Sequence, residues 1–308
     1  MTFFLGIDGG GTKTRCLLGD DTSVLGTGTG SGCSILRVGE ACARDSIAGA
    51  IHEACVQAGV SPQQISRTCA GVTGAADDGI ASLVQRLLIE VIGGAIEVIG
   101  DMEVALESAF EGGPGIVLVA GTGSIAYGRN QSGETARAGG WGRMISDEGS
   151  GHWIGVEALR AALHAYDAGN HTKLLQQLME ALQAHTVHDL AVRVNSDAAQ
   201  DFAALFPVVL NASENGDPIA ILLLDRAGHE LAVPVAAVAQ RLFRNARSAP
   251  VATHGGVLAR SARVKCAFKD RLHGLCANVQ ILDAVVDPAL GALNRARREF
   301  GIWHKDAH

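Results

Sequence analysis

The residues best suited to chemistry lie near the start of the chain, in a glycine-rich turn after an apolar segment. The turn reads Asp8-Gly9-Gly10-Gly11-Thr12-Lys13. Glycine has no Cβ and adopts positive φ at little cost, so the backbone N–H groups of such a turn can approach an anion closely. A carboxylate such as Asp8 can hold Mg²⁺ beside that anion, usually through water. The pattern predicts a phosphate-binding turn; a plain glycine-rich hairpin turn is the alternative.

Three further sets of residues follow predicted strands. The turn Gly121-Thr122-Gly123-Ser124 offers N–H groups and hydroxyls for a second phosphate. At Gly255-Gly256 bare backbone could lie flat against a nucleobase. Asp101 ends a strand in a doubly wound pattern, and ligands bind at that edge of open α/β sheets. Two of these sets also have a plainer interpretation: Asp101 as a helix cap and Gly255-Gly256 as a strand-to-helix turn.

The elements that must position these residues alternate between strands and helices. In the first part of the chain strands are predicted at 3–7, 15–19, 24–29, 68–72 and 95–99, and helices at 40–58, 80–91 and 103–110. A second unit opens at Gly115 with strands at 116–120 and 125–129 around the second glycine turn. Because this repeats the opening pattern, we expect a duplicated architecture with a cleft between the halves.

The rest of the chain is predicted to be mostly helical from 149 to 245. Asp217 and Pro218 suit the cap and first turn of the longest helix, which Pro234 should kink or divide. Strands follow at 251–254 and 279–282, and the last helix begins at Asp287.

Composition limits the classes of function. The chain has 308 residues, 47% hydrophobic and 19% charged, which is typical of a folded protein of two domains. The net charge of −7 and the lack of a basic stripe argue against sequence-independent nucleic-acid binding. No secretion signal or membrane span is recognised. Seven cysteines without a C-x-x-C pair indicate reduced thiols in the cytoplasm.

Several motifs together resemble a known superfamily. They are Gly6 to Thr14, Val98-Ile99-Gly100-Asp101, Val119 to Ser124, Gly139-Gly140-Trp141-Gly142 and Ser146-Asp147-Glu148-Gly149-Ser150-Gly151. The chain resembles the sugar-kinase, Hsp70 and actin superfamily, and more closely the N-acetylglucosamine kinases and their BadF-type relatives. The run from Gly139 to Gly151 is the most specific part, because it separates this group from actin and Hsp70.

The resemblance implies a role for each matching residue. Asp8 would organise Mg²⁺, and Gly9, Gly10, Gly11, Thr12 and Lys13 would form the first phosphate turn of an ATP site. Gly121, Thr122 and Gly123 would form the second, and Gly255 and Gly256 would lie beside adenine. Asp101 would be the general base for the sugar 6-hydroxyl. Ser124, Gly140, Trp141, Gly142 and Asp147 would line the sugar.

The chain departs from the family pattern in one loop. These kinases usually have a sugar-contacting Asn there, whereas this chain has Cys33 or Ser34, and of the two a serine hydroxyl is the better sugar ligand. Two assignments keep alternatives: Asp147 could cap the helix beginning near Ser150, and Trp141 could be a core aromatic.

The combined expectation is an α/β protein with two ribonuclease-H-like domains of the actin and hexokinase type around a nucleotide cleft. The predicted domains are 1–114, 115–287 and a C-terminal helix at 288–308 that returns to the first domain. The predicted function is an ATP- and Mg²⁺-dependent kinase for the 6-hydroxyl of N-acetylglucosamine or glucosamine, with a homodimer as the candidate assembly. The alternatives are a BadF-type ATPase activator of a CoA-ester reductase or dehydratase, and a non-enzymatic sugar sensor.

Overall fold

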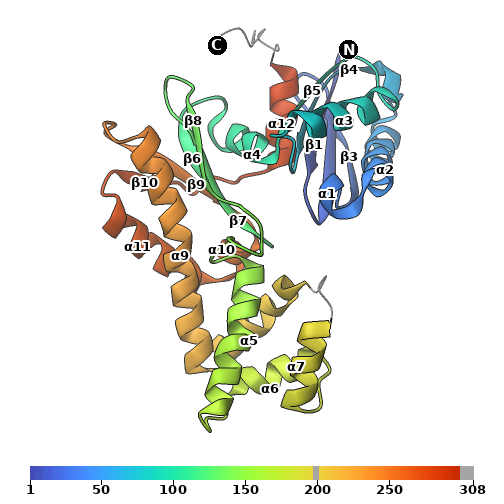
Figure 1. The fold of residues 1–308 in the computed structure, drawn as a ribbon. Helices are drawn as coiled ribbons and strands as arrows, with labels where there is room; N and C mark the ends of the chain where they lie inside the picture. Colours follow the sequence, from blue (N-terminus) through green and yellow to red (C-terminus); the bar gives the residue numbers. More distant parts are fainter. Residues whose placement is uncertain (197–200, 299–308) are drawn as a thin grey trace. The chain divides into compact units, whose positions relative to one another are not determined.

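The computed structural model describes residues 1–196 and 201–298, and Figure 1 traces them. The chain divides into two compact units. The first contains Met1–Gly113 together with the described residues from Val285 onward, and the second is Pro114–Ala284. In the described ranges, no helix is both long enough and apolar enough to cross a membrane.

The sheet of the first unit has five strands in the order β3-β2-β1-β4-β5. Their bounds are β1 Phe3–Gly9, β2 Lys13–Gly19, β3 Val24–Ser31, β4 Ile65–Val72 and β5 Ala95–Gly100. β1, β2 and β3 pair antiparallel, whereas β1, β4 and β5 pair parallel. The parallel strands therefore end at one edge, where Asp8 pairs with Gly71 and Val72 with Gly100.

Among its described residues, five α-helices and one 3₁₀ turn complete the first unit. They are α1 Ile35–Val38, α2 Glu40–Ala58, η1 Pro62–Gln64, α3 Asp78–Ile89, α4 Asp101–Phe110 and α12 Pro288–Arg297. α2 stops at Gly59, which adopts the left-handed conformation (φ 67°) that glycine tolerates. α3 begins where the Asp77 carboxylate accepts hydrogen bonds from the Gly79 and Ile80 N–H groups.

The last described helix, α12, packs on β1, β4 and α4. Close approach requires Gly6, because a Cβ there would lie 2.2 Å from the Leu293 backbone nitrogen. Arg295 also makes a bidentate ion pair with Glu97, at 2.8 and 2.7 Å. The helix thus completes the core around Phe4, Leu17 and Val104, although it is far from them in sequence.

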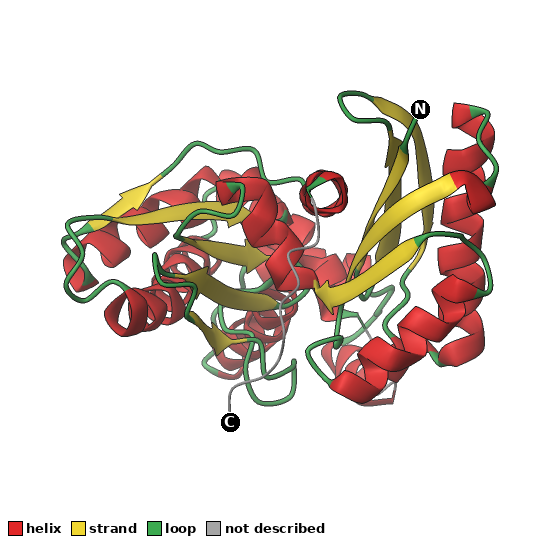
Figure 2. Ribbon diagram, turned by 90° about the horizontal axis from the view of Figure 1, so that it is seen from above, coloured by secondary structure: helices red, strands yellow, loops and turns green. Residues whose placement is uncertain are grey.

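The second unit has a five-stranded sheet in the order β10-β9-β6-β7-β8. The bounds are β6 Gly115–Ala120, β7 Ser124–Arg129, β8 Thr135–Gly139, β9 Ala249–His254 and β10 Val279–Ile281. β6, β7 and β8 are antiparallel, and β6, β9 and β10 are parallel. Within each unit the strands thus repeat one topology, which confirms the predicted duplication and α/β class; Figure 2 shows the sheets with their helices.

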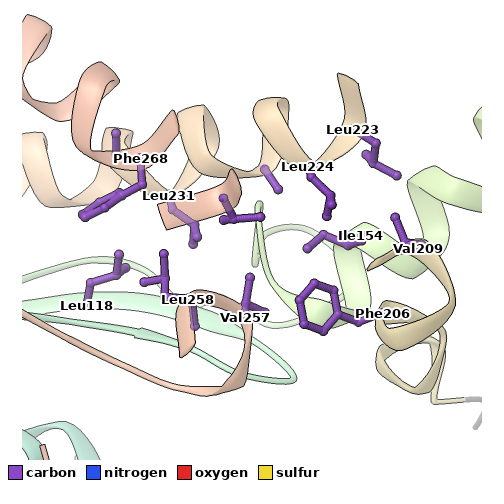
Figure 3. Close-up of a cluster of buried hydrophobic side chains, with 14 of the residues drawn as sticks. Leu118, Ile154, Phe206, Val209, Leu223, Leu224, Leu231, Val257, Leu258 and Phe268 are labelled. Atoms are coloured by element: carbon purple, nitrogen blue, oxygen red, sulfur yellow. The ribbon is translucent and has the colours of Figure 1, made fainter. Parts of the chain in front are cut away.

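The helices of this unit pack with its strands around one large hydrophobic core. They are α5 Gly151–Asp167, α6 Lys173–Ala181, α7 Val187–Ser196, η2 Phe202–Leu205, α8 Phe206–Glu214, α9 Pro218–Leu242, α10 Gly256–Arg260 and α11 Ala262–Leu275. Figure 3 shows side chains of this core, where Leu231 of α9, Phe268 of α11 and Leu118 of β6 are buried. α5 to α7 extend beyond the sheet (Figure 1).

Most sequence predictions of elements agree with the structure within a few residues. The sequence reasoning missed β8, the single turns α1 and η1, and the helices α10 and α11 between β9 and β10. Pro234 does not divide α9, which continues through it to Leu242. A proline removes one N–H, but the rest of this long helix is held by its buried face. The nucleotide cleft and the domain bounds stay predictions, and residues 299–308 of the predicted final segment lie outside the described ranges.

Candidate active site

The carboxyl ends of β1, β4 and β5 bring polar side chains together in the first unit. Asp8 lies near the end of β1, Thr73 directly follows β4, and Asp101 directly follows β5. The Thr73 N–H donates to the Gly9 carbonyl (2.8 Å), and its hydroxyl donates to Asp101 Oδ2 (2.6 Å). Asp101 Oδ1 accepts from the Met102 N–H at 3.0 Å. The Asp101 carboxylate is thus held in a fixed orientation at this edge.

Burial dominates the electrostatics of this edge. It raises the pKa of Asp8 to about 6, and the negative charge of Asp101 adds to the rise, while Lys13 opposes it. Burial also raises the pKa of Asp101, against which the hydrogen bonds from Thr73 and Met102 act. Two carboxylates therefore share a partly dehydrated site in which a nearby positive charge would favour their ionised forms.

These two carboxylates fit a magnesium site better than a protein-enclosed metal cage. Mg²⁺ prefers hard oxygen ligands and commonly uses one or two carboxylates, with waters and substrate phosphates as the other ligands. Over residues 1–196 and 201–298, no three His, Cys, Asp or Glu side chains gather as a metal-binding group. Asp8 is the carboxylate next to the glycine turn, so it is the residue placed to hold such an ion.

The glycine turn connects β1 and β2, and its tip is accessible. The Gly10 N–H donates to the Lys13 carbonyl at 2.9 Å, which closes the turn, and Thr12 and Lys13 are exposed. A Cβ at Gly9 would lie 2.5 Å from Cys33 Sγ, so the buried Cys33 thiol packs directly under the turn. Ser34, next along the chain, precedes α1 and is also largely buried.

In the second unit, the turn Gly121-Thr122-Gly123 joins β6 and β7. The Gly121 N–H donates to the Gly123 carbonyl (2.9 Å), and the Gly121 carbonyl accepts from the Gly151 N–H (2.8 Å). Nothing lies within 4 Å of a Cβ built at Gly121, so this backbone faces open space. The turn is therefore accessible to a ligand and tied to the first residue of α5.

The Gly255-Gly256 turn lies beside the preceding one, because β9 and β6 are neighbouring parallel strands with His254 paired to Val119. Gly255 has φ 106°, and a Cβ there would lie 2.3 Å from the Ala120 carbonyl oxygen. Gly256 begins α10, is exposed, and has open space around a Cβ. The first glycine is thus required by packing and the second is available to a ligand.

Asp147 adopts an uncommon backbone conformation next to the turn Gly121-Thr122-Gly123. Its φ is 69°, it is buried, and its Oδ2 would lie 2.9 Å from a Cβ at Gly123. Burial raises its pKa, while a hydrogen bond from the Ser124 backbone opposes the shift. The cap of α5 is Ser150, whose hydroxyl accepts from the Trp153 N–H at 3.2 Å. Helix capping therefore does not explain Asp147.

The loop before Asp147 is mostly exposed. Trp141 is 64% exposed, with the Arg137 guanidinium 4.0 Å from its ring centre. The alternative that Trp141 is a core aromatic is therefore wrong. Gly140 and Gly142 have φ of 68° and 98°, which suit glycine. Ser124, by contrast, is buried and its hydroxyl donates to the Glu148 carbonyl at 2.8 Å.

The structure places the predicted residues in two sets. The set in the first unit contains Asp8, the turn to Lys13, Ser34 and Asp101. The set in the second unit contains Gly121 to Ser124, Gly140 to Gly142, Asp147 and Gly255-Gly256. Sequence reasoning missed Thr73 and His152. Thr73 could have been found, because it follows a strand predicted to be parallel to the one before Asp101; His152 gave no sequence signal.

The duplicated sheets define a protein of the actin and hexokinase class, and comparisons with known proteins agree with this class. Residues 5–296 match the model of the BadF/BadG/BcrA/BcrD ATPase family, and the chain belongs to this family. An N-acetylmuramic acid/N-acetylglucosamine kinase from Clostridium acetobutylicum is 33% identical over 305 residues, covering 97% of this chain and 99% of that protein.

One further relative and one solved structure agree with this family assignment. An N-acetyl-D-glucosamine kinase from Dictyostelium discoideum is 32% identical, covering 94% of this chain and 96% of that protein. The crystal structure of a candidate N-acetylglucosamine kinase from Chromobacterium violaceum superposes with a TM-score of 0.75 at 28% identity, covering 95% and 98% of the two chains. The family resemblance and the enzyme class, an ATP-dependent sugar kinase, are confirmed.

Proposed function

We propose that this enzyme transfers the γ-phosphate of ATP to the 6-hydroxyl of N-acetylglucosamine, with glucosamine as the second candidate sugar. The observation that carries the proposal is the buried Asp101 carboxylate, held by Thr73 at 2.6 Å beside Asp8 and the first glycine turn. An oriented carboxylate with a raised pKa is suited to accept a proton from a sugar hydroxyl.

The first unit supplies the acid–base and phosphate chemistry of this proposal. Asp101 accepts the proton of the attacking hydroxyl, and Thr73 keeps the carboxylate in one orientation. The backbone of Gly9 to Gly11 and the exposed Thr12 and Lys13 contact the transferred phosphate. Asp8 would hold Mg²⁺, which would neutralise charge on the phosphates.

The second unit supplies nucleotide contacts and selectivity. The open backbone at Gly121 to Gly123 contacts the remaining phosphates, and Gly255-Gly256 lies against adenine. Asp147 accepts hydrogen bonds from sugar hydroxyls, because its buried carboxylate can take two donors. Trp141, flanked by Gly140 and Gly142, is an exposed aromatic surface for the sugar ring, and Ser124 supports the adjacent turn.

The loop after β3, where this chain lacks the asparagine usual in these kinases, bears on which sugar is used. Ser34 is the proposed sugar contact there, since the Cys33 thiol packs under Gly9. A serine is shorter than the asparagine usual in these kinases and offers a single hydroxyl. We therefore expect Ser34 to influence the relative use of N-acetylglucosamine and glucosamine.

The cytoplasm is the proposed compartment, because it supplies ATP and keeps thiols reduced. Homodimer formation stays a prediction.

The test is ADP release with Mg²⁺-ATP across N-acetylglucosamine, glucosamine, N-acetylmannosamine, glucose and no sugar. We expect release that depends on one hexosamine, with the phosphate on its 6-oxygen by NMR of the product. The isosteric variant Asp101→Asn is the matched control. Slow ADP release that does not depend on any sugar would overturn the proposal in favour of an ATPase activator. Tight sugar binding without ADP release would indicate a sensor.

A further inference from the structure

His152 is a buried residue that the proposed reaction does not use. It is the second residue of α5, directly after Gly151, and is only 8% exposed. Its Nδ1 atom is buried and has no hydrogen-bond partner. Buried polar atoms in proteins nearly always have a partner, so a nitrogen left without one calls for a specific explanation.

The backbone around His152 ties it to the second set of site residues. Its own N–H donates to the Thr122 carbonyl at 3.2 Å, and the Gly151 N–H donates to Gly121. Asp147 is five residues earlier, and its carbonyl accepts from the Ser150 N–H at 3.1 Å. His152 therefore lies where the second phosphate turn meets the segment that carries Asp147.

The side chain is fixed by neighbours that leave Nδ1 unused. The ring packs edge-on against Phe202 of η2, with centroids 5.5 Å apart and an interplanar angle of 64°. Burial and the positive charge of Arg143 lower the pKa of His152, and Asp201 opposes them. This environment favours the neutral imidazole, which suits a hydroxyl or an amide better than a phosphate.

We propose that His152 binds the amino sugar, with Nδ1 hydrogen-bonded to a ring substituent other than the reacting 6-hydroxyl. This assignment rests on the proposed function, since the ligand is its sugar substrate. His152 is then a specificity-determining residue: a sugar that presents a hydroxyl or amide at this point completes the hydrogen bond, and one that lacks it leaves Nδ1 unpaired.

Two substitutions separate the two ring nitrogens. In His152→Asn the amide lies near the position of Nδ1, whereas in His152→Gln it lies near the position of Nε2. His164→Gln, an exposed position on the same helix, is the control. We expect His152→Gln to raise the KM for the sugar about tenfold with the KM for ATP unchanged, and His152→Asn to keep most of the affinity.

Deoxy and desacetyl analogues then identify the contacted group. The rise in sugar KM caused by His152→Gln, the penalty of this variant, should disappear for the one analogue that lacks this group. A penalty equal for all analogues, or an equal rise in the KM for ATP, would overturn the assignment. If the wild-type enzyme shows no sugar-dependent ADP release, the proposed function fails as well; if it is active and His152→Gln keeps its sugar KM, only this assignment fails.

A spectroscopic experiment covers the case in which His152→Gln does not fold. Asp101→Asn protein labelled with ¹⁵N-histidine is titrated with N-acetylglucosamine in the absence of ATP, so that no turnover occurs. We expect the Nδ1 resonance of His152, assigned with His152→Asn, to shift with saturation while that of His164 does not. An unchanged Nδ1 resonance at saturating sugar would overturn the proposal.

Discussion

The Asp101 side chain makes two contacts that the sequence alone could not separate. It is the first residue of α4, and Gly100 is the N-cap. One oxygen accepts from the Met102 N–H at the helix start, and the other accepts from the hydroxyl of Thr73, which directly follows β4. A residue that served only the helix would not require the second contact. The Thr73 contact therefore fixes the orientation of this carboxylate in a way that the helix alone does not.

Asp101→Asn should abolish most phosphoryl transfer without loss of nucleotide binding. The amide has the same shape but cannot accept the proton, and general base catalysis typically contributes about 10²–10⁴-fold to the rate. We expect a kcat lower by about this factor, measured by coupled ADP release, with ATP affinity kept in calorimetry. A kcat near that of the wild type would exclude Asp101 as the base.

Thr73→Val should shift the acidic limb of the kcat–pH profile. The Thr73 hydroxyl lowers the pKa of Asp101 by stabilising the carboxylate, so its removal raises that pKa further. Because the base must be ionised, the limb moves to higher pH. Thr73→Ser keeps the hydroxyl and is the control. An acidic limb at the wild-type position in Thr73→Val would contradict a link between the two residues.

Asp8 makes the free protein less stable as the pH rises. Its pKa is about 6 in the folded protein against 3.8 ordinarily, so between these values the folded state retains a proton that the unfolded chain has lost. The free energy of unfolding of the wild type relative to Asp8→Asn should fall across pH 4–6, by at most about 3 kcal/mol, and then level off. Urea unfolding without Mg²⁺ measures it; a rising difference would contradict the assignment.

At the scale of elements, adjacent parallel strands carry the candidate site. In the first unit β1, β4 and β5 end together, and in the second β6 and β9 do the same. β1, β6 and β9 are each followed by glycines, whereas β5 leads directly into α4. Of the two glycines after β9, one is enclosed by protein and the other is open.

Gly255→Ala and Gly256→Ala should therefore differ. The first puts a Cβ 2.3 Å from the Ala120 carbonyl at a φ of 106°, so we expect a loss of unfolding free energy of about 1–3 kcal/mol or more. The second has space around the Cβ and a helical position, so stability should hold while ATP affinity falls. Thermal unfolding of both variants measures the change in stability, and nucleotide titration measures the change in ATP affinity. Unaltered ATP affinity in Gly256→Ala would remove it from the adenine site.

At the scale of the whole molecule, the two units differ in whether one continuous stretch of the chain forms them. The second is one continuous segment with its own large core. The first needs α12, whose Ala289, Ala292 and Leu293 are fully buried against its sheet and α4. The Arg295–Glu97 ion pair and the buried Glu107, which also pairs with Arg295 at 3.4 Å, add polar contacts to this docking.

Fragments of the chain should reflect this difference. We expect residues 114–284 to unfold cooperatively in urea when expressed alone. Residues 1–113 should lack a cooperative transition, because the apolar surface that α12 covers is exposed, and fusion of residues 285–298 through a flexible linker should restore it. Circular dichroism follows each transition. Equal stability of residues 1–113 with and without the fused segment would show that α12 is dispensable for this unit.

The sequence determined what depends on local physics. The glycine turns, the cap at Asp217 and the helix at Glu40–Ala58 follow from backbone freedom, capping and apolar periodicity within a few residues. Asp8 and Asp101 could be named because each directly follows or ends an apolar strand. Local patterns could not resolve β8 or predict that α9 continues through Pro234, since the first depends on pairing with β7 and the second on the buried face of the helix.

Only the tertiary structure decided which side chains meet. The Thr73–Asp101 hydrogen bond spans 28 residues, and its signal exists only when β4 and β5 pair in register. The exposure of Trp141 and the unpartnered nitrogen of His152 likewise depend on which segments pack over them. Chain sequence encodes turns and periodicity through neighbouring residues, whereas burial, pKa and hydrogen-bond partners arise from segments that are distant in the chain and adjacent in space.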